Sequence, residues 1–478
     1  MNLKAVLFDM GGTIETFGYT PEMRLQAIKG IRKYLLDAGN ETNLSDEALL
    51  QVVTKGLQKY HDYCLESLIE YPCKRVWCEF ILADLDCDLS GIDKVAEEMM
   101  VFVENNFYLR EMRPEIPEVL KSIRKMGLKI GLISNVNSIR QVPGNLEKYG
   151  IKEFFDPIVL SSEYGIRKPD PSIFHYAARL MNVPTSACVY VGDRIARDVI
   201  GSQKAGFRLA VQIEHDYDHG EEDTGATPDA YIKNMKELLD VLKTEMARPR
   251  MEPTSRIKAF LFDAGDILYF RPRKEHRFMD YLRELGLAEK WKELPGKKEL
   301  TRQAYTGQIS HEEFHMGYLR LLGISDPEEI KRGMKILAEE NIEVEFFEGV
   351  KDTLFELKES GYLLGIITNT ANSISNKLSW FETGGFGNVW DSIISSMEIG
   401  VVKPYPEIYH AALQQLGLAP DEAVFVGHKI SELDGAHAAG IPTIAFNFDK
   451  GAVADHYVNE FGELINAPML FATTPVKE

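Results

Sequence analysis

The chain has 478 residues, of which 45% are hydrophobic, and this length allows two to four globular domains. Its net charge of −19 argues against nucleic-acid and membrane-surface partners. No segment resembles a signal peptide or a membrane span, so we expect a cytoplasmic protein. Five cysteines occur without a CxxC pair, which predicts reduced thiols rather than metal ligands; four of them lie close together, at Cys64, Cys73, Cys78 and Cys87.

Short β-branched and apolar runs alternate with helical patterns in the first half of the chain. We predict strands at residues 5–8, 129–134, 157–162, 188–192 and 208–213, and helices at 118–126, 171–181 and 195–205. This alternation predicts an α/β fold with a doubly wound parallel sheet. In such a fold the functional residues lie at the carboxyl ends of the strands.

A helical insertion, residues 21–110, follows the first predicted strand directly. Its helical patterns occupy residues 23–38, 46–65, 75–82 and 94–107. An insertion at this point is expected to cover the carboxyl ends of the sheet as a cap. Its aromatic residues Trp77, Phe80 and Tyr108 are more typical of a core than of substrate contacts.

The same order of elements recurs after a Pro-punctuated polar linker at residues 246–256. We therefore predict two domains, 1–245 and 257–478, each a doubly wound, Rossmann-like α/β domain with an α-helical cap. Strands of the second domain are expected at residues 259–262, 363–368, 392–396, 423–427 and 442–446. Its cap, residues 274–340, is the shorter of the two.

Polar residues follow the predicted strands in the same order in both halves. They are Asp9, Ser134, Lys168 and Asp193 in the first half, and Asp263, Thr368, Lys403 and His428 in the second. One carboxylate can attack phosphorus, a second can hold a divalent cation, and a hydroxyl with an ammonium group can hold an anion. This combination favours phosphoryl transfer to an aspartate.

These motifs resemble those of the haloacid dehalogenase-like (HAD) superfamily. The residues that carry the resemblance are Asp9-Met10-Gly11-Gly12-Thr13, Ser134-Asn135, Lys168-Pro169, and Gly192-Asp193 followed by Asp198. The resemblance implies that Asp9 is the nucleophile and that Mg²⁺ binds Asp9, the Gly11 carbonyl and Asp193, with Asp198 supporting the metal. It also implies that Ser134, Asn135 and Lys168 hold the phosphoryl group of a small phosphorylated metabolite.

The first half departs from the family pattern at Gly11, where the phosphatases carry an aspartate that acts as acid and base. General acid–base catalysis is typically worth ~10²–10⁴ in rate. Glu15 is the nearest carboxylate that could replace it, but we expect Glu15 to face solvent on a hairpin.

The second half departs further from the pattern. Gly265 again replaces the acid, His428 replaces the metal-binding aspartate, and Glu432 stands for Asp198 with one residue lost from the loop. An imidazole is a poor ligand for Mg²⁺. We predict a degenerate second site, made of Asp263, Thr368, Asn369, Lys403, His428 and Glu432.

The leading function is a Mg²⁺-dependent phosphatase in the first domain that acts through an aspartyl-phosphate. One alternative is a metal-independent haloacid dehalogenase, which the pair Asp193 and Asp198 disfavours. The other is a weakly active or non-catalytic binding or regulatory protein. Three arginines are candidates for an anionic substrate, Arg75, Arg110 and Arg113, and contact between the two domains is left open.

Overall fold

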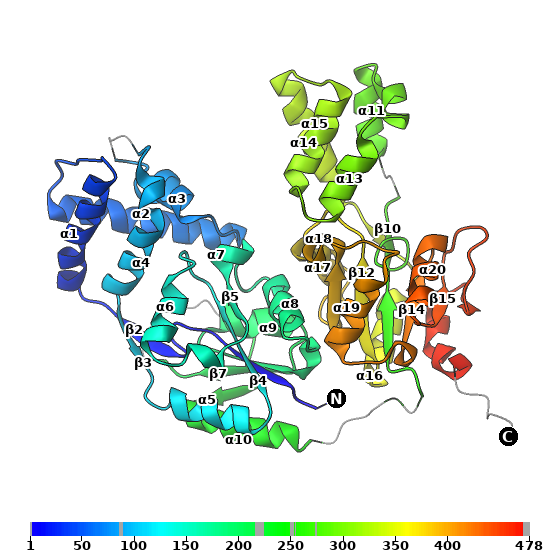
Figure 1. The fold of residues 1–478 in the computed structure, drawn as a ribbon, viewed down its shortest axis with the longest axis horizontal. Helices are drawn as coiled ribbons and strands as arrows, with labels where there is room; N and C mark the ends of the chain where they lie inside the picture. Colours follow the sequence, from blue (N-terminus) through cyan, green and yellow to red (C-terminus); the bar gives the residue numbers. More distant parts are fainter. Residues whose placement is uncertain are drawn as a thin grey trace. The chain divides into compact units, whose positions relative to one another are not determined.

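The computed structural model describes residues 2–85, 89–215, 224–248, 253, 255–272 and 275–471. Cys87, Lys274 and part of the predicted linker, residues 249–252 and 254, lie outside these residues. The chain divides into two compact units, Met1–Arg248 and Pro249–Glu478 (Figure 1). Among the described residues, no helix is long and apolar enough to cross a membrane.

The sheet of the first unit has six parallel strands in the order β5-β4-β1-β6-β7-β8. They are β1 (Ala5–Phe8), β4 (Lys129–Ser134), β5 (Ile158–Leu160), β6 (Cys188–Gly192), β7 (Leu209–Ile213) and β8 (Ala230–Ile232). The chain builds outward from β1 on one side through β4 and β5, and then on the other side through β6, β7 and β8. The carboxyl end of β1 is therefore a topological switch point, where ligands bind in open α/β sheets.

Helices cover both faces of this sheet, because successive strand residues point to opposite faces. Val6 and Phe8 join one core cluster, which includes residues of α5 (Ile116–Lys125), α6 (Gln141–Lys148) and α10 (Met235–Met246). Ala5 and Leu7 join the other, with α8 (Pro171–Leu180), which packs beside α9 (Ile200–Lys204). All four residues of β1 are buried, so the strand that carries the switch point is also the centre of the core.

A helical insertion lies between β2 (Glu15–Gly18) and β3 (Leu109–Met112), which pair in an antiparallel hairpin. Its main helices are α1 (Pro21–Asp37), α2 (Asp46–Ser67), α3 (Cys73–Val76) and α4 (Ala96–Asn106). Thr20 and Ser45 cap α1 and α2 by accepting bonds from backbone N–H groups of their first turns. The insertion has a core of its own around the buried Trp77, against which Phe80 and Tyr108 pack.

The second unit repeats this plan with the parallel order β13-β12-β9-β14-β15-β16. Its strands are β9 (Ala259–Phe262), β12 (Leu363–Thr368), β13 (Ser392–Ser395), β14 (Ala423–Gly427), β15 (Thr443–Ala445) and β16 (His456–Tyr457). The helices beside this sheet include α16 (Val350–Glu359), α17 (Ile374–Thr383), α19 (Pro406–Leu416) and α20 (Ile430–Ala438). A second insertion runs between β10 (Tyr269–Phe270) and β11 (Glu345–Phe346), with α11 (His276–Glu284), α12 (Ala288–Lys292), α13 (Lys297–Tyr305), α14 (His311–Leu322) and α15 (Pro327–Ile342). These helices stand apart from the sheet in Figure 1 and have a core of their own.

The fold class predicted from the sequence is confirmed, and all ten predicted strands are present within two residues of their expected ends. The sequence patterns missed the edge strands β8 and β16 and the hairpin of β10 and β11, whereas the hairpin at Glu15 was expected from the resemblance. The missed segments have only two or three residues. A run of that length is too short to show the period-2 alternation of a strand.

We expect residues 1–248 to fold without the second unit. Each of the described core clusters consists of residues from one unit only, so cutting the chain after Arg248 removes no described core residue from the first unit. Circular dichroism of the isolated piece should show a cooperative thermal transition. A gradual loss of signal without a transition would contradict this expectation.

Candidate active site

The carboxyl ends of the central strands bring the candidate residues of the first unit together. Asp9 follows β1, Ser134 ends β4 and Asp193 follows β6, and all three are at most 4% exposed. The backbone N–H of Asp9 donates to the Val191 carbonyl at 2.9 Å, which continues the sheet ladder as far as Asp9. These residues meet because the three neighbouring parallel strands end at one edge of the sheet.

Lys168 links the two carboxylates on either side of it. Its Nζ lies 2.7 Å from Asp9 Oδ1 and 2.7 Å from Asp198 Oδ1, and it is fully buried. The same ammonium donates to the Tyr190 hydroxyl at 2.7 Å and to the Ile133 carbonyl at 3.0 Å. An ammonium group with this many buried acceptors is held in one position, charged, beside Asp9.

Asn135 holds the loop that carries Lys168 rather than extending freely into the site. Its Nδ2 donates to the Lys168 carbonyl at 2.9 Å, and its Oδ1 accepts from the Lys168 N–H at 2.9 Å. Both functional ends of the amide are therefore engaged with backbone. This makes Asn135 a positioning residue for Lys168; it also lines the pocket above Asp9, and its contact with substrate stays a prediction.

Asp198 reaches the site from a π-helical turn, Ile195–Val199, that precedes α9. Such turns carry one extra residue and are frequent at functional sites. The Asp198 carboxylate accepts from the Arg194 N–H at 3.1 Å. A Cβ added to Gly192 would lie 2.3 Å from the Asp198 Cβ, and one added to Gly12 would lie 2.2 Å from Asp193 Oδ2. Both glycines are needed because the carboxylates pack directly against the backbone.

Arg197 places a positive charge between the three carboxylates. Its Nη2 lies 2.8 Å from Asp9 Oδ2, 3.0 Å from Asp193 Oδ1 and 3.4 Å from Asp198 Oδ2. The motif containing Arg197 was recognised in the sequence, but no role was assigned to this arginine. A second cation is needed here, because three buried carboxylates repel one another and the single positive charge of Lys168 offsets only one of their three negative charges.

The donor set of this cluster fits a hard divalent cation. Asp9, Asp193 and Asp198 each offer a carboxylate oxygen, and these atoms lie within 4.8 Å of one another. Oxygen ligands of this type suit Mg²⁺. Burial raises the pKa of Asp9 to about 6, with Asp193 and Asp198 adding to the rise and Lys168 and Arg197 opposing it. The cluster therefore favours an added positive charge beside these carboxylates.

A pocket of about 570 Å³ opens above Asp9, between the sheet and the helical insertion. Its lining includes Ser134 and five arginines: Arg24, Arg110, Arg167, Arg194 and Arg197. Burial lowers the pKa of His61, which also lines the pocket, and Arg167 and Arg194 lower it further. The arginine donors of the lining suit an anionic ligand. Arg110, Arg167 and Arg197 also pair with the carboxylates of Glu15, Glu70 and Asp9, which offset part of their charge. Sequence patterns pointed only to Arg110, because the other four come together through the fold.

The structure corrects the expectation for Glu15, and it places two of the three candidate arginines outside the pocket. Glu15 does not face solvent: it is fully buried, pairs with Arg110 at 2.5 Å and accepts from the Tyr149 hydroxyl at 2.8 Å. Arg113 donates to the Gly12 carbonyl at 2.8 Å and so supports the first motif. Arg75 pairs with Glu79 at 2.8 Å on the surface and is not among the pocket residues.

Comparison with known proteins agrees with this geometry. Residues 3–206 match the model of haloacid dehalogenase-like hydrolases, and residues 292–446 match a second model of that description. The glyceraldehyde 3-phosphate phosphatase of Methanopyrus kandleri is 32% identical over 252 residues, which are 52% of this chain and 99% of that protein. The chain belongs to the haloacid dehalogenase-like hydrolase family.

Another curated relative and a solved structure are also similar to this chain. The glyceraldehyde 3-phosphate phosphatase of Methanocaldococcus jannaschii is 32% identical over 250 residues, covering 50% of this chain and 97% of that protein. A solved HAD phosphatase from Thermococcus onnurineus aligns with 51% of this chain and its own full length, at 24% identity and a TM-score of 0.37. Two family-model matches in one chain make the protein a tandem HAD hydrolase.

The second HAD unit keeps part of this site. Lys403 Nζ lies 2.6 Å from Asp263 Oδ1. Asn369 and Lys403 repeat the backbone clamp, at 3.2 and 2.8 Å, and Thr368 is buried at the end of β12. Although burial opposes ionisation, Lys403 holds the pKa of Asp263 below its ordinary value. Burial lowers the pKa of His428, so its imidazole is neutral near pH 7.

We predicted that the second unit has lost one residue from the loop before the helix. The structure instead places this one-residue difference in the helix. In the first unit the Val199 N–H reaches back five residues to the Arg194 carbonyl, at 3.3 Å. In the second unit the Leu433 N–H reaches back four residues to the Lys429 carbonyl, at 3.1 Å. The second unit has an ordinary α-helical turn where the first has the π-turn.

We expect Arg197→Ala to raise the affinity of the first site for Mg²⁺. Removing the guanidinium leaves three buried carboxylates with Lys168 alone, and breaking a buried pair in this way costs on the order of 3 kcal/mol in the metal-free protein. Bound Mg²⁺ should restore most of this loss, so the shift of the melting temperature with Mg²⁺ should be larger than in the unmodified protein. Arg140→Ala, which removes an exposed ion pair with Glu98, is the matched control and should leave the shift unchanged. An equal shift in all three proteins would contradict the expectation.

Proposed function

We propose that the first HAD unit is a Mg²⁺-dependent phosphatase of a small, anionic phosphorylated metabolite. The observation that supports this most directly is the convergence of Asp9, Lys168, Asp193 and Asp198 at the switch point, beneath a pocket lined by arginines. Relatives that share about half of this chain are named glyceraldehyde 3-phosphate phosphatases, so glyceraldehyde 3-phosphate is the first substrate to test.

In the proposed reaction the Asp9 carboxylate attacks phosphorus, the ester P–O bond breaks, and the leaving oxygen departs with the bonding electrons. Water then attacks the aspartyl-phosphate, which releases phosphate and regenerates Asp9. Lys168 keeps Asp9 oriented and its charge offsets that of the phosphoryl oxygens, while the Ser134 hydroxyl donates a hydrogen bond to one of them. Mg²⁺ held by Asp9, Asp193 and Asp198 would supply charge neutralisation.

The alternative of a metal-independent carbon–halogen hydrolase receives less support. Such a reaction makes no use of three carboxylates gathered in one buried cluster. Mg²⁺ separates the two functions directly. A phosphatase loses turnover of an aryl phosphate in a chelator and regains it with Mg²⁺, whereas dehalogenation of a 2-haloacid is indifferent to both.

We expect catalysis to belong to the first unit. Asp9→Asn should abolish Mg²⁺-dependent hydrolysis of an aryl phosphate by the full chain, because an amide is not a nucleophile at this step. Asp263→Asn is the matched substitution in the second unit and should leave turnover unchanged, since His428 stands at the metal position there. Equal losses in the two variants would show that both units act or that neither does.

The rate should depend steeply on the pKa of the leaving group, because Gly11 supplies no proton. Aryl and acyl phosphates should be hydrolysed well and simple alkyl phosphates poorly. Gly11→Asp should flatten this dependence and raise alkyl phosphate turnover, by up to the ~10²–10⁴ of a placed general acid. The backbone has room: an added Cβ would lie 3.8 Å from Arg110 Nη1 and 3.8 Å from Phe17.

Gly265→Asp is the matched control for this substitution. Its added Cβ would meet only the Tyr269 hydroxyl, at 3.9 Å, so it is equally tolerated. It should change no rate, because it places an acid in the unit that we expect to be inactive. A shallow leaving-group dependence in the unmodified protein would contradict the role given to Gly11.

A further inference from the structure

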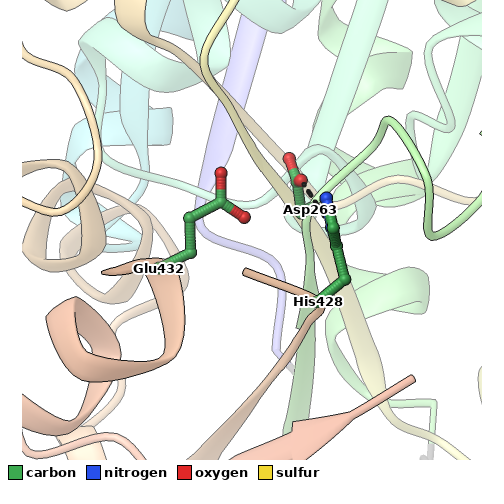
Figure 2. Close-up of side chains that lie close together, drawn as sticks. All are labelled: Asp263, His428 and Glu432. Atoms are coloured by element: carbon green, nitrogen blue, oxygen red, sulfur yellow. Dashed lines mark ion pairs between the residues drawn. The ribbon is translucent and has the colours of Figure 1, made fainter. Parts of the chain in front are cut away.

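The second unit holds a buried cluster of ligand-type side chains that differs in chemistry from the cluster in the first. Asp263 follows β9, His428 follows β14 and Glu432 lies in α20, and each is at most 5% exposed. One ligand atom from each lies within 4.8 Å of the others. Figure 2 shows the carboxylates of Asp263 and Glu432 and the ring of His428 facing a common space.

Two atoms of this cluster have no hydrogen-bond partner in the part of the chain that the structure describes. They are His428 Nδ1 and Glu432 Oε2, and both are buried. Lys403 approaches the other carboxylate oxygens, Asp263 Oδ1 at 2.6 Å and Glu432 Oε1 at 3.3 Å, and Lys429 approaches Glu432 Oε1 from the surface at 3.7 Å. A buried imidazole nitrogen and a buried carboxylate oxygen that face one space call for a cation between them.

The orientation of His428 leaves its inner nitrogen available as a ligand. Its Nε2 lies 3.7 Å from the half-exposed Asp266 carboxylate, so the neutral ring can carry its proton on Nε2. The lone pair of Nδ1 then points inward, where Asp263 Oδ2 lies at 3.6 Å. Ligand atoms about a tetrahedral zinc with bonds of 2.0–2.1 Å are ~3.4 Å apart, so Asp263 and His428 need little movement, and Glu432 has to move closer from within 4.8 Å. A carboxylate behind a histidine is the usual second partner of a metal-bound imidazole.

The pair Asp266 and His428 replaces the pair Gly12 and Asp193 of the first unit. Gly12 and Asp266 occupy the same turn: both have a left-handed backbone, with φ of +83° and +60°, and each N–H donates to the third residue along at 2.7 Å. In the first unit a side chain at Gly12 would collide with Asp193. The two positions therefore differ together between the units. The second unit has the His428 imidazole with the Asp266 carboxylate on its outer side, where the first unit has the Asp193 carboxylate and a glycine.

We propose that the second unit binds a borderline divalent transition metal, represented by Zn²⁺, through His428 Nδ1, Asp263 and Glu432. A nitrogen donor with two carboxylates suits such an ion and is a poor set for Mg²⁺, which prefers oxygen ligands only. Three protein ligands leave a position for water or a ligand. The metal joins β9, β14 and α20, so it stabilises the second unit whether or not the first is active.

The test uses the full chain, stripped of metal with a chelator, and titration calorimetry with Zn²⁺ alone. Asp193→Asn removes the competing site of the first unit, and in this background we expect one Zn²⁺ per chain that millimolar Mg²⁺ does not displace. Adding His428→Ala should weaken Zn²⁺ binding at least ~100-fold. Asp266→Asn, which alters only the group behind the ring, should weaken it by the ~10–100-fold typical of such partners.

His428→Asp combined with Asp266→Gly is the complementary variant, since it restores the oxygen ligand of the first unit together with the glycine that this carboxylate needs beside it. It should lose the preference for Zn²⁺ and gain Mg²⁺ binding, and it keeps the test decisive if His428→Ala does not fold. Co²⁺ in place of Zn²⁺ should give visible absorption bands that disappear in both His428 variants. Retention of full Zn²⁺ affinity in His428→Ala and in the combined variant, or easy displacement of Zn²⁺ by Mg²⁺, overturns the proposal.

Discussion

The burial of like charges at the carboxyl end of the central strand governs the rest of the first unit. Asp9, Asp193 and Asp198 are each at most 2% exposed, and their ligand atoms lie within 4.8 Å of one another. Carboxylates at such distances cannot all remain ionised without cations between them. Lys168 and Arg197 supply two positive charges, and the clamp between Asn135 and the Lys168 backbone fixes one of them. The motifs are thus parts of a single electrostatic arrangement.

The two units show how a small change in a helix alters such an arrangement. The π-turn lets Asp198 accept from the Arg194 N–H while Arg197, one residue earlier, points to the same carboxylates. The α-helical turn of the second unit has one residue fewer, and there Glu432, with a side chain one carbon longer, comes within 3.3 Å of Lys403. A longer side chain compensates for the shorter turn, but the arginine position between the carboxylates is lost.

Much of the fold and the motif residues could be predicted from the sequence, because both depend on local patterns. Buried parallel strands are continuous apolar runs, and the residue after each run lies at the sheet edge, which located Asp9, Ser134 and Asp193. The partners of Glu15 could not be predicted, because Arg110 and Tyr149 reach it from distant segments. The same reason hid Arg24 and Arg167 in the pocket, and the two-residue strand His456–Tyr457 carried too little pattern to be found.

The pocket presents several arginine side chains to a ligand, but it has no acid at position 11 that could transfer a proton. Arg110 is the cation nearest the place where an acid at position 11 would stand, but it is already paired with Glu15 at 2.5 Å and Glu104 at 2.7 Å. Its charge is therefore largely neutralised, and Glu15 is held away from solvent by the same pair. A leaving oxygen in this pocket receives neither a proton from Gly11 nor an unpaired positive charge from Arg110. In the phosphatase that we propose, the arginine side chains of the wall would hold the anionic substrate, and the rate of bond breaking would depend on the leaving group.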